Sequence, residues 1–471
     1  MEYKERKVLV VGLDSAAPDL VFDRFKDELP NLKLMAEEGV YGRLRSCHPP
    51  ITIPAWITMA TGVNPGKLGL YGFRHRKNNS YTEISLPTSR SVKERRVWDY
   101  IGDAGRKVCV VGVPPSYPPQ RVNGWMVSCM MTPSAKSQYT YPRGLRDEVE
   151  RVAGEYVFDV AFRKEDREGV LRDIYDMTEK HFKVVEYLIA EKPWSFFMFV
   201  EIGLDRIQHA FWRFFDEEHH LYEPSKFKNV VKDYYKYLDE KIGRILSMID
   251  DDTAVLVVSD HGAKRMKGAF CVNEWLIREG YLKVKGGKAT RGVNDCEPGV
   301  AEPEEVDVDW EHTKAWAWGG YYARVFINLR GREEKGAVKP SDYDRVRDEL
   351  AEKLKGIRGP RGEKWNTSVY KPEELYPVCN GSPPDLIVYF DDLSWRSAGT
   401  IGHKTLYLAE NDRGPDDAVH DYDGVFILYD PRRSLGGRRV AVDILDVAPT
   451  ILKLMGLPVP ATMEGRPVEG V

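Results

Sequence analysis

The segment Ala254-Val-Leu-Val-Val-Ser-Asp-His-Gly262 combines a short apolar run with two polar residues directly after it. The run is rich in valine, and a glycine break follows it, which is typical of a strand in a mainly parallel sheet. Two polar groups that are costly to bury stand where this strand would leave the core. We therefore interpret Asp260 and His261 as functional residues rather than as structural ones.

Other short apolar runs, each followed by a polar or glycine break and a helical pattern, lie along the chain at Lys7–Val11, Val108–Val113, Ser195–Val200 and Val425–Tyr429. Strands that alternate with helices indicate βαβ units. We therefore predict an α/β fold with a doubly wound, mainly parallel sheet sandwiched by helices. Further helices are expected at Pro30–Glu38 and Asp446–Met455, because a glycine closes each of them.

Between Ala263 and Tyr407 this alternation loosens into charged segments that contain proline and glycine. A helix predicted over Ser341–Lys355 and a strand predicted over Asp385–Phe390 indicate that the region is folded and is not a linker. We therefore predict a core built from residues 1–262 and 408–471, interrupted by an inserted cap over residues 263–407. The cap is the part expected to select the substrate.

The composition is that of a globular protein with a sizeable core, because 42% of the 471 residues are hydrophobic and 30% are charged. The net charge of −4 gives no reason to expect binding to nucleic acid or to an anionic membrane. The six cysteines include no C-x-x-C pair, and the N-terminus does not resemble a signal peptide. We therefore expect a cytoplasmic protein without nucleic-acid or membrane partners. The sequence indicates no oligomeric state.

Residues that commonly bind metal ions follow or precede other predicted strands. Asp14 ends the first apolar run, Asp205 and His209 follow Ser195–Val200, and His420 precedes the last run. Ligands of open α/β sheets bind beyond the carboxyl ends of the strands. Asp205 and His209 are four residues apart and would share one face of a helical turn. Taken singly, Asp14 also fits a helix cap and His420 a structural histidine.

The nucleophile candidate is Thr52, in the segment Cys47-His-Pro-Pro-Ile-Thr-Ile-Pro-Ala-Trp56. The prolines on both sides disfavour a helix up to Ile53, and Pro54 is a favourable first-turn residue. We therefore expect Thr52 to lie at a helix N-terminus, where backbone amides favour a phosphate or an oxyanion. The alternative is that Thr52 only caps this helix.

Taken together, and in their order along the chain, these segments resemble the alkaline phosphatase superfamily. More narrowly, they resemble its type I phosphodiesterase and nucleotide pyrophosphatase branch. The matching segments are Asp14, Thr52-Ile-Pro-Ala-Trp56, Thr61-Gly-Val-Asn-Pro-Gly66, Asp205-x-x-x-His209, Asp260-His261-Gly262 and His420. The resemblance extends from the first strand to the C-terminal Asp446–Gly456 segment and leaves out only the cap.

The resemblance implies a hydrolase of phosphoric esters that uses two divalent metal ions and acts on a small-molecule phosphate ester. One ion would be held by Asp205, His209 and His420. The other would be held by Asp14, Asp260 and His261, with Thr52 completing its ligands and acting as the nucleophile. Mixed carboxylate and imidazole ligands suit Zn²⁺ best, and Mn²⁺ or Fe²⁺ also fit.

One departure from the branch bears on the substrate. Nucleotide pyrophosphatases carry a histidine and then a phosphate-binding asparagine where this chain has Leu68 and Phe73. The resemblance therefore implies that this phosphate contact is lost or replaced, which weighs against a nucleotide. Arg74-His-Arg-Lys77 could supply charge nearby, or could form a solvated turn.

Three alternatives stay open. A sulfatase of the same superfamily would use a cysteine in a Cys-x-Pro-x-Arg context, which Cys47-His-Pro-Pro matches except for Ile51 in place of the arginine. A phosphomutase of the superfamily would make the chain an isomerase. A non-catalytic metal-binding relative would have kept the sheet and lost turnover.

Overall fold

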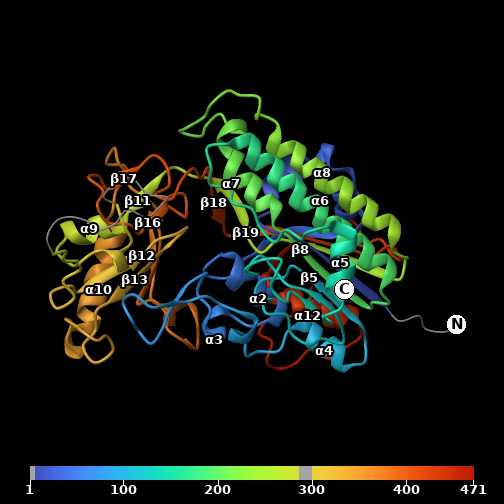
Figure 1. Cartoon of the computed structure of the whole chain (residues 1–471), viewed down its shortest axis with the longest axis horizontal. Coiled ribbons are helices and arrows are strands. Elements are labelled where there is room, and N and C mark those ends of the chain that lie inside the picture. Colours follow the sequence, from blue (N-terminus) through green and yellow to red (C-terminus); the bar gives the residue numbers. More distant parts are fainter. Residues whose placement is uncertain (1–5, 286–299, 471) are drawn as a thin grey trace.

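The computed structural model describes residues 6–285 and 300–470 (Figure 1). Among these residues nine strands form one large sheet. In spatial order they are β20 (Arg438–Asp443), β2 (Val40–Arg45), β19 (Asp423–Tyr429), β9 (Thr253–Val258), β1 (Lys7–Leu13), β8 (Phe196–Glu201), β5 (Val108–Val111), β6 (Gly124–Val127) and β7 (Thr140–Tyr141). The predicted α/β sheet is thus confirmed, and every strand expected from an apolar run is present.

The centre of this sheet is parallel and buried on both faces. Strand β1 pairs in parallel with β8 on one side and with β9 on the other, so that Val8 lies beside both Phe196 and Ala254. Leu9 joins the core above the sheet and Val10 the core below it. A strand that faces apolar side chains on both sides needs a continuous apolar run, which is the pattern that made these strands recognisable in the sequence.

Helices cover both faces of the sheet (Figure 1). One face carries α1 (Pro30–Glu38), α5 (Leu145–Ala153), α6 (Arg167–Glu191), α7 (Gly203–Phe215) and α8 (Val230–Met248). The other carries α2 (Thr52–Thr61), α3 (Pro65–Leu68), α4 (Val97–Asp103) and α12 (Val447–Leu454). The arrangement is the helix–sheet–helix sandwich that the sequence predicts.

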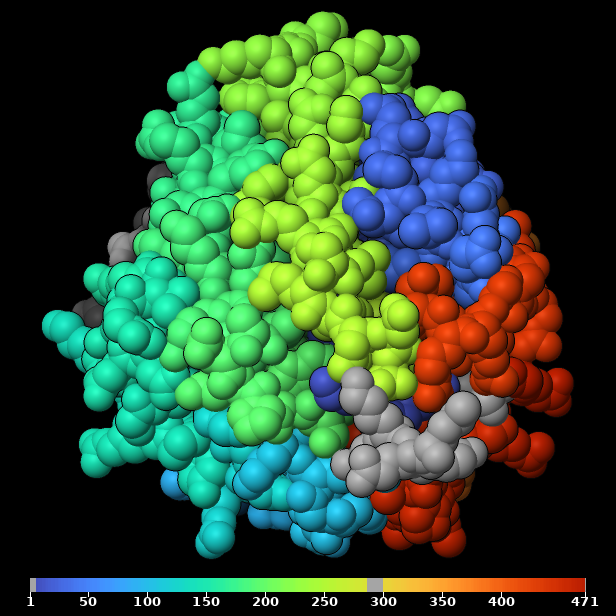
Figure 2. Space-filling view, turned by 90° about the vertical axis from the view of Figure 1, so that its right-hand side faces the viewer, coloured from blue at the N-terminus to red at the C-terminus, as the bar shows by residue number. Residues whose placement is uncertain are grey.

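Helix α1 begins with Pro30 and has no side-chain cap of its own. Its free amides are satisfied instead by the buried carboxylate of Asp239 on α8, which accepts hydrogen bonds from the backbone of Asn31 at 3.1 Å and of Leu32 at 2.8 Å. Figure 2 shows the result on the surface, where the blue residues of the α1 region lie directly beside the yellow-green α8.

A smaller lobe lies beside the sandwich (Figure 1, left). It contains two further sheets and three α-helices among the described residues. The sheets are β12 (Ala315–Trp318), β13 (Ala323–Ile327), β15 (Leu386–Tyr389) and β14 (Ser368–Tyr370), and β16 (Arg396–Ala398), β11 (Ala269–Cys271) and β17 (Tyr407–Leu408). The helices are α9 (Val272–Arg278), α10 (Tyr343–Lys355) and α11 (Pro372–Leu375). The helix and the strand predicted inside this region are thus present.

The lobe has its own hydrophobic core, which includes the fully buried Trp316. Residues 263–407 do not build that core alone, because Tyr81 contributes to it and stacks on Trp310 with the ring centroids 3.9 Å apart. Tyr81 lies between the two strands of a hairpin, β3 (His75–Arg76) and β4 (Ile84–Ser85). The exact division of the chain into core and cap stays a prediction.

Two shorter strands connect the sandwich and the lobe. Strand β10 (Gly262–Arg265) follows β9 and pairs antiparallel with β18 (Ala418–Asp421).

No described helix combines the length and the hydrophobicity that crossing a membrane requires. Cys296 and the beginning of the charged segment from Glu297 to Asp309 lie outside the described residues.

Candidate active site

The predicted site residues meet at the carboxyl ends of the central strands. Asp14 follows β1, and Asp260 and His261 follow β9. Asp205 and His209 are four residues apart on α7, which begins directly after β8. His420 lies on β18 and joins them through the pairing of β18 with β10. All six side chains are buried, with 0–2% of their surface exposed.

Asp205, His209 and His420 form one group whose possible ligand atoms all lie within 4.8 Å of one another. Oδ1 of Asp205 is 3.2 Å from Nε2 of His209 and 3.8 Å from Nε2 of His420. The helical spacing of Asp205 and His209 therefore places both side chains toward one point, as the sequence predicts.

Asp14, Asp205 and His261 form a second such group. Nε2 of His261 lies 3.7 Å from Oδ1 of Asp14 and 3.2 Å from Oδ2 of Asp260. Thr52 is part of the same neighbourhood, because its Oγ1 is 3.4 Å from Nε2 of His261. Asp205 belongs to both groups and so lies between them.

The three imidazoles are oriented by bonds on the side away from the cluster. Nδ1 of His261 donates to the carbonyl of Gly262 at 3.0 Å, and Nδ1 of His420 donates to the carbonyl of Pro50 at 2.9 Å. A carbonyl can only accept, so the proton lies on Nδ1 and the lone pair on Nε2. Nδ1 of His209 bonds Asp416 at 2.7 Å. Each ring thus presents Nε2 to the carboxylates, as metal-binding histidines do.

Two features of the cluster suit divalent cations. Several of its described, buried ligand atoms have no hydrogen-bond partner, and several carboxylates lie close together. Oδ1 of Asp14, Oδ1 of Asp205, Nε2 of His209 and Oδ2 of Asp260 are buried and have no hydrogen-bond partner among the described residues. Burial raises the pKa of Asp14 well above its ordinary value, and Asp205 raises it further. Burial and then Asp14 raise the pKa of Asp260 in the same way. Bound cations would satisfy these atoms and offset the repulsion among the carboxylates.

Thr52 is the first residue of α2. The helix therefore begins two residues before the expected start at Pro54. A proline in the first turn removes only an amide that would have no intrahelical partner, so Pro54 is tolerated there. Ile51 occupies the cap position, and Thr52 makes no capping hydrogen bond. The alternative that Thr52 only caps the helix is wrong, and its hydroxyl faces His261.

Trp56, one turn after Thr52, supports the first carboxylate of the cluster. Its indole Nε1 donates to Oδ2 of Asp14 at 2.7 Å, and its ring is fully buried. The ring can reach this position because β1 carries Gly12, where a Cβ atom would lie only 2.7 Å from the ring. The Thr-Ile-Pro-Ala-Trp segment thus positions both the hydroxyl and a carboxylate partner.

Cys47, the residue that a sulfatase would need, has a different environment. Its thiol is buried and donates to the carbonyl of Pro49 at 3.3 Å. Burial raises the pKa of this thiol far above its ordinary value. Cys47 does not line the cleft in front of the cluster, whereas Thr52 does.

Several residues that serve the cluster were not predicted from the sequence. Asp416 bonds His209, and Arg206 donates to Oδ2 of Asp205 at 2.5 Å. Tyr321 stacks on His420 with the ring centroids 3.9 Å apart. Asp416 lies in a Gly-Pro-Asp-Asp stretch that reads as an ordinary turn, and Arg206 is one of 69 basic residues. Only the positions of Asp416, Arg206 and Tyr321 in the fold show that these residues serve the cluster.

A cleft of about 340 Å³ opens in front of Thr52, between the sandwich and the smaller lobe. Phe73 lines it, whereas Leu68 is packed into the core below the sheet. The Arg74–Lys77 segment is not simply a solvated turn, because Arg74 lines the cleft and Arg76 is buried in an ion pair with Glu333. Positive charge therefore does lie near the site.

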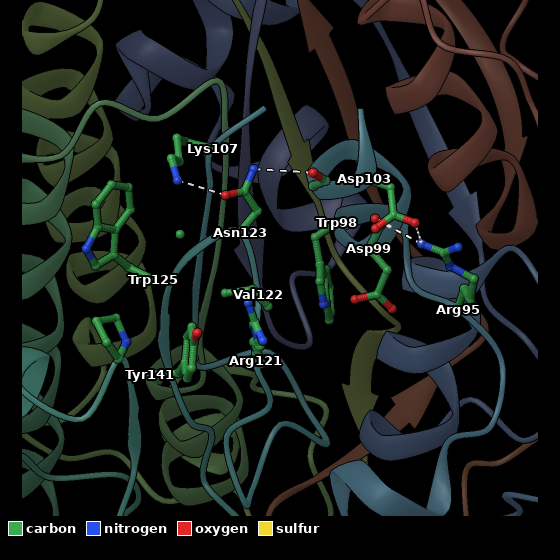
Figure 3. Close-up of a pocket in the computed structure, with 13 residues that line it drawn as sticks. Arg95, Trp98, Asp99, Asp103, Lys107, Arg121, Val122, Asn123, Trp125 and Tyr141 are labelled. Atoms are coloured by element: carbon green, nitrogen blue, oxygen red, sulfur yellow. Dashed lines mark hydrogen bonds and ion pairs between the residues drawn. The ribbon is translucent and has the colours of Figure 1, made fainter. Parts of the chain in front are cut away.

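A larger hollow of about 860 Å³ lies at the opposite end of the sheet (Figure 3). Lys107 and Asn123, which precede β5 and β6, lie on its wall and are joined by a 2.8 Å hydrogen bond. This is the amino end of the parallel strands, where ligands of open α/β sheets do not usually bind. The smaller cleft beside Thr52 is therefore the better candidate for the active site.

The fold and the match to a protein family assign the chain to a class of protein, the hydrolases that act on phosphoric ester bonds. The chain belongs to the type I phosphodiesterase/nucleotide pyrophosphatase family, whose model matches residues 8–416. The family is metal-dependent. A comparison with curated protein sequences found no match.

Solved structures share the fold over nearly the whole chain. Human ectonucleotide pyrophosphatase/phosphodiesterase 5 is 13% identical, with a TM-score of 0.57 over 98% of this chain and 97% of that one. An inactive variant of the murine protein, in complex with AMP, is 15% identical, with a TM-score of 0.55 over 97% and 96%. Phosphonoacetate hydrolase from Sinorhizobium meliloti, in complex with phosphonoformate, is 16% identical, with a TM-score of 0.58 over 96% of each chain.

Proposed function

We propose that this chain hydrolyses small phosphate esters, with Thr52 as the nucleophile and two divalent cations bound by the buried cluster. The observation that carries the proposal is the 3.4 Å approach of Thr52 Oγ1 to His261 Nε2, at the edge of a cluster rich in unpartnered ligand atoms. One cation would be held by Asp205, His209 and His420, and the other by Asp14, Asp260, His261 and Thr52. Zinc suits these ligands best, and Mn²⁺ or Fe²⁺ also fit.

When bound, such a pair of cations lowers the pKa of a coordinated hydroxyl and stabilises charge on the leaving oxygen. The residues of the chain supply the other requirements. Thr52 Oγ attacks phosphorus, forming an Oγ–P bond while the ester P–O bond breaks and the leaving alcohol takes up a proton. Water then attacks the phosphothreonine, the Oγ–P bond breaks, and the Thr52 hydroxyl regains its proton as phosphate leaves.

The position of Thr52 suits this role. As the first residue of α2, it lies where backbone amides without intrahelical partners and the helix dipole favour a phosphoryl group. Trp56 holds Asp14, and Asp416 holds His209, so that the ligands keep their positions while the substrate changes.

The cleft supports a small phosphate ester better than a nucleotide. The inactive murine variant was solved in complex with AMP and the Sinorhizobium protein in complex with phosphonoformate, so this fold accommodates ligands of very different size. In this chain, Leu68 and Phe73 replace the histidine and the phosphate-binding asparagine that the resemblance implies for nucleotide pyrophosphatases. Diesters and monoesters fit the proposed step, and pyrophosphates and phosphonates fit the metal-binding cluster but would release a different leaving group.

A cytoplasmic location is part of the proposal. It is supported by the cysteines, of which the five described ones are free thiols, four of them buried. A reducing compartment maintains thiols in that form.

The test is a rate comparison with metal-loaded enzyme on three aryl esters of the same alcohol, a phosphodiester, a phosphomonoester and a sulfate. Hydrolysis of a phosphate ester that is lost on chelation and restored by zinc would support the proposal. Preferential hydrolysis of the sulfate would instead favour the sulfatase alternative, and no turnover of any ester would favour a non-catalytic relative.

A further inference from the structure

Five arginines line the cleft in front of Thr52, and they differ in their partners. Three of them face carboxylates. Arg163 and Arg396 both bond Asp416, at 3.0 and 2.8 Å. Arg206 bonds Asp205 and Asp159. Each of these three thus has a carboxylate partner, and Arg163 and Arg396 share theirs. The remaining two, Arg324 and Arg74, have no ion pair with any described carboxylate.

Arg324 lies on β13, and only 6% of its surface is exposed. Its Nη1 donates to the backbone carbonyl of Arg74, whereas its Nε is buried without a partner and its Nη2 forms no hydrogen bond to a described residue. A guanidinium with unused donors is costly to bury unless an anion satisfies it. Arg324 lines the cleft that also contains Thr52, so an anion bound there could come from the substrate.

Arg74 places a second positive charge beside the first. The guanidinium groups of Arg74 and Arg324 both lie over the ring of Trp318, at 5.7 and 5.1 Å from its centroid. Glu304 is an acidic neighbour of both arginines, but it forms no ion pair with either of them. Its carboxylate accepts a 2.6 Å hydrogen bond from the Trp318 indole. Two like charges beside one aromatic ring repel each other, and a bound anion would offset that repulsion.

This pair of arginines lies apart from the metal-binding cluster. The hydrogen bonds and ring contacts of Arg324 and Arg74 join them to each other, to Trp318 and to Tyr322, and to no described residue of the cluster. The cleft continues past Arg74 into an adjoining hollow of about 230 Å³. An anion held by the pair would thus be a different group from the phosphoryl group beside Thr52.

We propose that Arg324 and Arg74 bind a second anionic group, a carboxylate or a phosphate, carried by the organic part of the substrate. The inference rests on the proposed function, because it places the reacting phosphorus beside Thr52. The substrate class is then a phosphate ester whose organic part ends in an acid. A planar guanidinium binds either acid through paired N–H donors.

The test measures binding to the metal-loaded enzyme by calorimetry, with three probes that contain no ester bond. Propylphosphonate carries one acidic group, 3-phosphonopropionate adds a carboxylate, and ethane-1,2-bisphosphonate adds a second phosphonate. We expect one of the two doubly acidic probes to bind at least about tenfold more tightly than propylphosphonate, as a paired charge-assisted contact allows. Which of them binds more tightly distinguishes a carboxylate from a phosphate as the second group.

In Arg324→Met we expect the tighter binding of the doubly acidic probe to disappear. The affinity for propylphosphonate should stay unchanged. Arg74→Met, on a partly exposed residue, gives the same test if Arg324→Met does not fold. Arg143→Met, an exposed arginine elsewhere, makes the same change in net charge and should keep the preference. Equal affinities in the unchanged enzyme, or a preference that survives in both arginine variants, would overturn the inference.

The proposed function can fail separately. An enzyme that binds the doubly acidic probes through Arg324 but hydrolyses no ester would contradict the function and leave the binding site standing. An enzyme that hydrolyses aryl phosphates but shows no preference among the probes would contradict only the inference.

Discussion

The carboxylate of Asp416 accepts a 2.7 Å hydrogen bond from Nδ1 of His209. Burial opposes the charge on Asp416, but His209, Arg163 and Arg396 hold its pKa below the ordinary value. An ionised acid behind a metal-binding imidazole fixes the orientation of the ring and makes Nε2 a stronger donor to a cation. The second oxygen of the same carboxylate is held by the two arginines, so the acid itself is fixed.

We therefore expect Asp416→Asn to weaken metal binding by roughly 10- to 100-fold, because the amide keeps the size but loses the charge. The affinity can be measured by competition with a coloured chelator, and activity should return at high metal concentration. Asp423→Asn, at the start of β19, is the matched control, since its carboxylate pairs with surface arginines and with no other described cation. An unchanged metal affinity in Asp416→Asn would show that the hydrogen bond is merely structural.

The proposed pair of cations leads to a second prediction. Protein purified without chelators should contain about two divalent ions per chain, as in two-metal hydrolases. His420→Ala removes one ligand from the group of Asp205 and His209 and should lower the content toward about one ion. Elemental analysis measures both values. Full activity after exhaustive dialysis against chelator would rule out a catalytic role for the ions.

The sequence predicted the parts of the site that follow strands. Asp14, Asp205 and Asp260 could be found because the strands before them are continuous apolar runs, and a parallel sheet brings the ends of its central strands to one edge. Arg324 could not be found, because a single arginine in the apolar strand Ala323–Ile327 reads as a residue that faces solvent. Its burial depends on Trp318 and Tyr322, and on the carbonyl of Arg74.

The first residue of α2 was predicted incorrectly from the sequence, for a different reason. The rule that a residue before proline avoids helix predicted an extended Ile53, yet the structure places Ile53 in the first turn of the helix. The local preference is weak compared with the burial of all ten residues of α2, five of which belong to the core below the sheet. Packing therefore decided the boundary, and with it the position of Thr52 inside the helix.

The ion pair between Arg76 and Glu333 leads to a stability prediction. Both side chains are buried, with 3% and 0% exposed, and Nη1 lies 2.9 Å from Oε1. Glu333→Ala leaves the guanidinium of Arg76 uncompensated, and we expect a loss of about 3–5 kcal/mol in the free energy of unfolding. Urea denaturation followed by tryptophan fluorescence measures it.

Glu83→Gln provides the comparison, because Glu83 pairs with Lys77 in the same hairpin but at the surface, where both side chains are more than half exposed. Glu83→Gln should leave the midpoint of urea denaturation nearly unchanged. Equal effects of the two substitutions would mean that the buried pair does not hold the hairpin against the smaller lobe.

The aromatic residues of the smaller lobe are expected to separate into two kinds. Trp316 has no exposed surface and belongs to the lobe's own core. Tyr321 lines the cleft and stacks on His420. Trp316→Ala should therefore destabilise the protein by roughly 3–5 kcal/mol and lower the rates on all esters alike.

Tyr321→Leu should instead change the relative rates among esters while the melting temperature stays close to that of the unchanged protein. A set of aryl and alkyl phosphates, assayed at constant metal concentration, makes the comparison. Parallel losses on every substrate in Tyr321→Leu would assign Tyr321 to the support of His420 rather than to substrate selection.

The last prediction concerns Thr52 itself. Thr52→Ala removes the hydroxyl near His261 but leaves the six acids and imidazoles of the cluster in place, so metal binding should largely survive. Activity should fall by several orders of magnitude, as when one member of a catalytic unit is deleted. Thr52→Ser should keep partial activity, because serine offers the same hydroxyl without the methyl group that restricts its rotamer.

Cys47→Ala separates this mechanism from that of a sulfatase. The Cys47 thiol is buried outside the cleft, and its raised pKa disfavours the thiolate, so its loss should cost stability rather than turnover. Rapid acid quench of the unchanged enzyme during turnover, followed by mass spectrometry, should recover a phosphoryl group on the peptide that contains Thr52, because a phosphothreonine is stable in acid. Near-normal turnover in Thr52→Ala together with an inactive Cys47→Ala would replace the threonine mechanism by the cysteine one. Loss of activity in Thr52→Ala with metal content intact, and an active Cys47→Ala, would establish that the hydroxyl at the start of α2 performs the attack.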